Sequence, residues 1–180
     1  KGHDLAMQLQ FPHGMIWNLN QVALAWTEKS NLDSADFYFS KAIRLSYESG
    51  DTLAAGNLLN SIGINYYYQG NFSKAIQYYD SSLFLFDKLK NNEGMARSLN
   101  NLGIIYRIRR NYNKALETYR RSLAIKEKLN DSTGIAVSHY NLGYAFTFLN
   151  DQENSLRHFT LASEIYKKLN NEEEVYKTSM

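Results

Sequence analysis

The side chains best suited to acid–base catalysis or metal binding in this sequence are its histidines, and their spacing supports neither role. The four are His3, His13, His139 and His158. They form no HExxH motif and show no other spacing typical of paired metal ligands. His139 stands where other copies of the repeat described below carry leucine, so we interpret it as a packed core side chain. We therefore predict no catalytic centre and no metal site.

Other motifs that carry chemistry are missing as well. The sequence contains no GxGxxG and no GxxxxGK[ST] segment, so it offers no recognisable phosphate-binding loop. It also contains no cysteine, which removes thiolate nucleophiles, thiolate metal ligands and disulfides together. The sequence therefore predicts a protein that is not an enzyme and that uses no cofactor.

Charge and hydropathy narrow the classes of partner. The chain has 20 Lys and Arg against 18 Asp and Glu, a net charge of +2 that gives no general attraction to nucleic acid or to an acidic membrane. Its longest apolar runs fall far short of the ~20 residues that span a bilayer, so we expect no membrane segment in this chain. The compartment stays open between the cytoplasm, which we favour, and a periplasmic sensor region.

A sequence repeat with a period of 40 organises the whole chain. Gly63, Gly103 and Gly143 recur at this period, and Ala23 takes the same place in the first copy. Each of these small residues is followed by one aromatic residue, then by a second small residue, then by a second aromatic residue. The aromatic pairs are Trp26 with Phe39, Tyr66 with Tyr79, Tyr106 with Tyr119, and Phe146 with Phe159. The second small residues are Ala35, Ala75, Ala115 and Ser155.

The spacing within each copy predicts two helices. In the second copy the apolar positions of the first helix fall at i, i+3, i+4 and i+7, which is one face of a helix. These positions are Leu59, Ile62, Gly63 and Tyr66. Short polar residues that can cap a helix precede seven of the expected helix starts. They are Asp51, Asn91 and Asp131 before first helices, and Asn31, Asn71, Asn111 and Asp151 before second helices.

Stacked helical hairpins of this kind bury one continuous core, so we predict an all-α, right-handed α-solenoid. Its four repeats would be residues 11–50, 51–90, 91–130 and 131–170. We expect residues 1–10 to end a preceding second helix and residues 171–180 to begin a following first helix, as in a fragment of a longer array. Glycine inside a helix costs about 1 kcal/mol against alanine. We therefore expect the second helix to approach each glycine closely, with the Ala75-type residue facing it.

The repeat resembles the tetratricopeptide family. That family places a large residue, an aliphatic, a Gly, an aromatic, an Ala, an aromatic and then a Pro at fixed offsets over about 34 residues. The third copy has Leu99, Leu102, Gly103, Tyr106, Ala115 and Tyr119 in that order, and the resemblance covers essentially the whole chain. The period of 40 and the missing closing proline are departures. They make the chain similar to the longer repeats of kinesin light chains, LGN-type adaptors and bacterial Rap-type regulators, and to input regions of bacterial histidine kinases and transcription factors.

The resemblance implies a binding groove lined by the first helices. Two residues before each small residue stand Gln21, Ser61, Asn101 and Asn141. Related arrays often carry Asn at this place, where its donor and acceptor hold the backbone of an extended peptide. The correspondence is firm for Asn101 and Asn141, Gln21 could substitute, and Ser61 is too short to reach. Alternatively, these amides bridge adjacent first helices and have a purely structural role.

Residues beside this row complete the candidate groove. Ile104 and Tyr144 could take apolar side chains of a ligand, and packing between repeats is the alternative role for such residues. Arg97 and Arg107 add positive charge beside the row, which favours an acidic or phosphorylated segment. The cationic clamp that some relatives use on a C-terminal carboxylate is not matched in this sequence, because Asn60, Ile64 and similar residues occupy its positions.

Positive charge is concentrated in the third repeat. From Asn91 to Asn130 there are nine Lys or Arg and three Glu, and Arg120 and Arg121 lie on the second helix of that repeat. This surplus is consistent with a solvated helix face, with an acidic partner segment, or with docking of another domain of the same polypeptide.

The function that the sequence favours is a protein- or peptide-binding scaffold. The resemblance places such a scaffold in the regulatory or sensory part of a larger bacterial signalling protein, for example a histidine kinase or a transcriptional regulator. The alternative is a nucleic-acid-binding helical repeat that uses the basic third repeat. Base-reading repeats need regular polar side chains at two or three positions per repeat, and the rows beside Asn101 are irregular.

Overall fold

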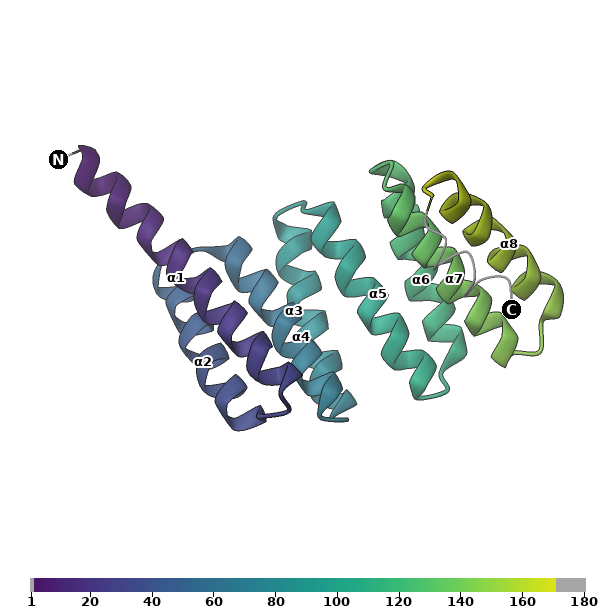
Figure 1. The fold of residues 1–180 in the computed structure, drawn as a ribbon, viewed down its shortest axis with the longest axis horizontal. Coiled ribbons are helices and arrows are strands. Elements are labelled where there is room, and N and C mark those ends of the chain that lie inside the picture. Colours follow the sequence, from purple (N-terminus) through teal and green to yellow (C-terminus); the bar gives the residue numbers. More distant parts are fainter. Residues whose placement is uncertain (1, 171–180) are drawn as a thin grey trace. The chain divides into compact units, whose positions relative to one another are not determined.

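The computed structural model describes residues 2–170, with side chains from residue 12 onward, and within this range the chain forms helices and no strand (Figure 1). The helices are α1 (Gly2–Glu28), α2 (Leu32–Glu48), α3 (Thr52–Tyr68), α4 (Phe72–Lys88), α5 (Asn92–Ile108), α6 (Tyr112–Lys128), α7 (Ser132–Phe148) and α8 (Gln152–Lys168). From α2 onward the helix starts are evenly spaced, at half the period of the sequence repeat. Two helices therefore fill one repeat, which confirms the predicted all-α hairpin.

The chain divides into two compact units, Lys1–Gly94 and Met95–Met180. In the first unit α1 packs against α2 and α3 against α4, while α3 also contacts α1 and α2. In the second unit α6 contacts α7, α7 packs against α8, and α5 meets α6 where Gly103 lies against Tyr119. Within each unit, hairpin stacks on hairpin, as in an α-solenoid.

The turns repeat as regularly as the helices. In each turn one residue adopts a positive φ, namely Ser30, Gly50, Gly70, Lys90, Arg110, Asn130, Asn150 or Asn170. The following residue caps the next helix, where its side-chain oxygen accepts a hydrogen bond from the backbone N–H three residues on. These contacts, from Asn31 to Asp151, are 2.9–3.3 Å long. All seven caps predicted from the sequence are therefore confirmed.

The glycine in each first helix makes room for an aromatic ring. A Cβ added at Gly63 would lie 2.5 Å from a ring carbon of Tyr79, and one added at Gly103 would overlap the ring of Tyr119. The predicted close approach of the two helices is confirmed. The atoms nearest to an added Cβ at Gly63 all belong to the second-helix aromatic Tyr79, and Ala75 is not among them.

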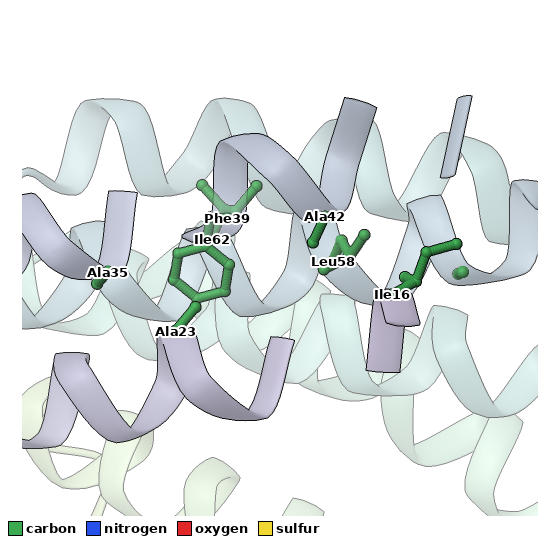
Figure 2. Close-up of a cluster of buried hydrophobic side chains, with 8 residues drawn as sticks. Ile16, Ala23, Ala35, Phe39, Ala42, Leu58 and Ile62 are labelled. Atoms are coloured by element: carbon green, nitrogen blue, oxygen red, sulfur yellow. The ribbon is translucent and has the colours of Figure 1, made fainter. Parts of the chain in front are cut away.

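Buried apolar side chains join neighbouring helices in each unit. In the first unit the cluster comes from α1, α2 and α3, and its members Ile16, Ala23, Ala35, Phe39, Ala42, Leu58 and Ile62 are labelled in Figure 2. In the second unit Tyr119 of α6 packs with Leu142 and Phe146 of α7. In two hairpins a serine hydroxyl of the second helix also forms a hydrogen bond with the backbone of the first helix. Ser82 donates to the carbonyl of Gly56, and Ser122 donates to that of Ala96, both at 2.8 Å.

The first helix departs from the repeat. A break was expected after residues 1–10, yet α1 runs continuously from Gly2 to Glu28. None of the described residues before Ser30 has the positive φ that closes the other turns. Phe11 stands where the other helices have a capping Asn or Asp, so no side-chain acceptor favours a new helix start there. The expected helix in 171–180 lies outside the described residues.

Candidate peptide-binding site

Two of the predicted groove residues meet across neighbouring repeats. The guanidinium of Arg107 on α5 lies 5.6 Å from the ring centroid of Tyr144 on α7, which is a cation–π contact. Tyr144 is 38% exposed and Arg107 is half-buried, so the pair reaches the surface. Nε of Arg107 is shielded from water and has no hydrogen-bond partner. The fold therefore leaves this shielded N–H without an acceptor.

The amide of Asn141 bridges two first helices. Its Nδ2 donates a 2.8 Å hydrogen bond to Oδ1 of Asn100 on α5, and the contact is partly buried. This is the bridging geometry that the structural interpretation of the row expects for Asn141. The bond uses the donor of one amide and the acceptor of the other. The Oδ1 of Asn141 and the Nδ2 of Asn100 take no part in this bond.

The other candidate residues differ in their surroundings. Asn101 is half-buried and Arg97 is exposed, both on α5. Ile104 packs against the apolar cluster of α6 and α7, so packing between repeats is its observed role. Gln21 is exposed on α1 and belongs to the first unit, whereas the other six candidates belong to the second.

A second row of amides, one residue before the predicted row, was missed in the sequence analysis. Its members are Asn20, Asn60 and Asn100, again one in each successive copy of the repeat. Asn60 is almost fully buried, and Oδ1 of Asn20 is buried without a partner. The recurrence of Asn could have identified this row, but Tyr140 interrupts it in the fourth copy. Asn100 joins the candidate site as the partner of Asn141.

Two histidines that lie apart in the sequence come together in the last hairpin. Nδ1 of His139 on α7 lies 2.9 Å from Nδ1 of His158 on α8, so one nitrogen donates and the other accepts. His139 is half-buried, so its interpretation as a core side chain holds only in part. Burial lowers the pKa of both rings, and for His158 the nearby His139, Arg157 and Arg120 help to bring it to about 4. Among the described residues, no group of three or more His, Asp or Glu is placed to hold a metal ion.

Comparison with known proteins identifies the class of this fold. Residues 94–168 match the family model of the tetratricopeptide repeat, and no curated protein matches the chain. Similar solved structures are BtubC (BKLC) from P. vanneervenii, with a TM-score of 0.79 and 22% identity, and the apo form of RapI, with 0.80 and 22%. A third is a signal transduction ATPase with numerous domains and a tetratricopeptide repeat sensor from Pyrococcus horikoshii, with 0.82 and 20%.

These three structures cover 88%, 91% and 91% of this chain, whereas the chain covers 66%, 46% and 25% of theirs. Residues 94–168 thus match tetratricopeptide repeats, and the fold of the chain is a helical solenoid like those that these proteins contain. Such repeats are typical scaffolds for protein–protein interaction and generally carry no catalytic centre. No helix within the described residues is long and apolar enough to cross a membrane.

Proposed function

We propose that this chain binds a protein or peptide segment along the first helices of its second unit, where Arg107, Tyr144, Asn101 and Asn141 would contact the ligand. The observation that carries the proposal is the Arg107–Tyr144 pair. It places a guanidinium, whose Nε has no hydrogen-bond partner, against a partly exposed ring. Such a pair suits a segment that combines an acidic or phosphorylated side chain with an apolar one.

The amides beside this pair support recognition of a peptide backbone. Asn141 and Asn100 are already hydrogen-bonded to each other, so both side chains are held in fixed orientations. Each retains one polar atom for a ligand, and a peptide unit needs one donor and one acceptor. A pre-organised pair of this kind lowers the entropic cost of binding an extended segment.

The test begins with a partner captured on the immobilised chain and identified by mass spectrometry, whose binding segment is then titrated by calorimetry. Changing Asn101 and Asn141 together to Ala should weaken binding by about 1–3 kcal/mol, because buried peptide hydrogen bonds are lost. Arg121→Ser on α6 is the control, since Ser81 stands at the equivalent position of the second repeat. Equal affinities of the wild type and the double variant, or an equal loss in the control, would refute the site.

We also propose that the array is the regulatory or sensory part of a larger bacterial signalling protein. Two observations support a signalling role: the chain is similar in fold to RapI, and it is similar in fold to the array described as the sensor of a signal transduction ATPase. The coding sequence on both sides of this chain provides the test. An adjoining kinase, receiver or helix-turn-helix domain would support the proposal, and an unrelated enzyme domain would contradict it.

A further inference from the structure

The turn between α5 and α6 lies beside an exposed pair of aromatic rings. Tyr112, the first residue of α6, stacks on Phe148, the last residue of α7, with ring centroids 5.3 Å apart and an interplanar angle of 1°. Phe148 is 50% exposed, and Ile108 at the end of α5 is 38% exposed. Together with the cations described next, these residues form a surface that we call the turn patch. It consists of Ile108, Arg109, Arg110, Tyr112, Lys114 and Phe148.

Three cations lie close in sequence to Tyr112 of the aromatic pair. Arg109 and Arg110 form the turn itself and are exposed, and a 3.0 Å bond from the backbone N–H of Arg110 to the carbonyl of Arg107 closes it. Lys114 is exposed on the first turn of α6, and its Nζ lies 5.4 Å from the ring centroid of Tyr106. Within the described part of the chain, no carboxylate forms an ion pair with any of the three. Their charge is therefore available to a partner.

Among the four repeats, only the third has two arginines in the turn between its helices. The turn positions of Arg109 and Arg110 are occupied by Lys29 and Ser30, by Gln69 and Gly70, and by Leu149 and Asn150 in the other copies. Since the turn forms equally well with these residues, the fold does not require two arginines there. Arginine is also a costly choice for the residue at φ 59°, because this left-handed region favours Gly and Asn.

We propose that the turn patch is a docking surface for an acidic peptide segment of a partner protein. The carboxylates of the segment would face Arg109, Arg110 and Lys114, and an apolar side chain of the segment would lie against Phe148. Charge complementarity selects this occupant, since only a segment that carries both acidic and apolar side chains matches the whole surface. The proposal goes beyond the groove proposed above, because none of the six residues belongs to that site.

A nucleic-acid strand fits this surface less well. Tyr112 and Phe148 already cover one face of each other, so they do not offer a free stacking platform for successive bases. The chain's net charge of +2 also provides no extended basic stripe for a phosphate backbone.

The test uses a fluorescein-labelled synthetic peptide of glutamates around a central phenylalanine, titrated with the 180-residue chain and followed by fluorescence anisotropy. The variant is Arg109→Gln, Arg110→Asn and Lys114→Asn combined, because Gln69, Asn150 and Asn154 occupy these positions in other repeats. The turn should form as well as in the wild type, or better, since Asn tolerates a positive φ. At an ionic strength of about 50 mM, where surface charges are weakly screened, we expect the variant to bind the peptide roughly tenfold more weakly.

The matched control removes three other exposed cations, by Arg121→Ser, Lys128→Gln and Lys167→Gln, and should change the affinity by less than about twofold, because these charges lie apart from the patch. A peptide of glutamates alone should bind more weakly than the one with phenylalanine. The proposal would be overturned by an equal loss in the control, by equal binding of both peptides, or by no binding of the acidic peptide. Tighter binding of a single-stranded oligonucleotide, lost in the patch variant, would also overturn it.

Discussion

The side-chain amide of Asn65 on α3 donates a 2.8 Å hydrogen bond to the carboxylate of Asp36 on α2. Its oxygen accepts a 2.8 Å hydrogen bond from the hydroxyl of Thr27 on α1. Asn65 is completely buried, so one amide joins three helices of the first unit. Leaving such an amide unpaired would cost about 1–3 kcal/mol. The network therefore favours the one helix arrangement in which all three side chains meet.

Replacing Asp36 by Asn should stabilise the first unit at neutral pH. Burial raises the pKa of Asp36 above its usual value, so the charged form is disfavoured in the folded chain. Its contribution to stability is greatest below the usual Asp pKa and falls as the pH rises through the raised one. An Asn at this position still accepts from Asn65 without the cost of burying a charge. We expect a gain of up to about 1 kcal/mol at pH 7, limited because water still reaches the carboxylate.

Urea denaturation at pH 7 and at pH 3 measures this effect. The gain should be present at pH 7 and vanish at pH 3, where the Asp36 carboxyl of the wild type is neutral as well. A loss of stability at pH 7 would contradict the argument, because it would mean that the charged hydrogen bond to Asn65 outweighs the cost of burial.

The repeat, the positions of the helices from α2 onward and all seven caps were predictable from the sequence, because they depend on local signals that recur along the repeats. Asn71 caps its helix whatever lies elsewhere, since its side chain needs only the backbone N–H of Lys74. The length of the second helices was also predictable from a local signal, because no proline ends them.

Features that depend on partners from other elements were harder to predict. Ala25, Ile105 and Ala145 hold the position of Asn65 in the other copies, so periodicity predicts an apolar residue there. The partners of Asn65 lie on α1 and α2, which a single repeat does not contain. The pairing of His139 with His158 was missed likewise, because it needs the actual angle between α7 and α8. In the candidate site, Arg107 and Tyr144 were both named, but their contact was not.

Replacing Gly103 by Leu should destabilise the second unit by about 1–3 kcal/mol through overpacking. A Cβ at this position would overlap the ring of Tyr119 and lie 2.9 Å from Oγ1 of Thr118. Tyr119 is completely buried, so its ring can shift only if its neighbours shift as well. Thermal denaturation followed by circular dichroism measures the loss.

The control for this variant is Gly14→Ala on α1, where an added Cβ meets nothing within 4 Å. Alanine at this position should stabilise the folded chain by about 0.5–1 kcal/mol, because glycine is the weaker helix former. An unchanged melting temperature in Gly103→Leu would contradict the placement of the α5–α6 contact.

Mild acid should destabilise the last hairpin through the His139–His158 pair. Because the pKa of His158 is lowered to about 4, the unfolded chain takes up its proton first as the pH falls. The neutral His158 ring therefore contributes its full share to the free energy of unfolding above about pH 6.5. This contribution is lost progressively as the pH falls toward about 4. We expect a loss of about 1–2 kcal/mol over this window, after allowing for the solvent that reaches both rings.

Two variants isolate this effect, and both use residues that other copies carry. His139→Leu introduces the residue found at Leu59 and Leu99, and His158→Tyr introduces the one found at Tyr78. Each should flatten the dependence of the free energy of unfolding on pH between about 6.5 and 4, because only one imidazole remains to be protonated. An unchanged slope in both variants would assign the acid sensitivity to other groups.

Replacing Arg107 by Lys should weaken binding of a captured partner segment by about 1–2 kcal/mol, although the charge is kept. The planar guanidinium can lie over Tyr144 and still present paired N–H donors to a carboxylate, whereas an ammonium is a compact point charge. Stability should change by less than about 0.5 kcal/mol, because Nε of the arginine has no hydrogen-bond partner to lose. Arg121→Lys, on α6 and exposed, is the matched control outside the candidate groove. If calorimetry gives the same affinity for wild type and Arg107→Lys, or an equal loss for Arg121→Lys, then positive charge alone attracts the ligand. The Arg107–Tyr144 geometry would then not recognise it.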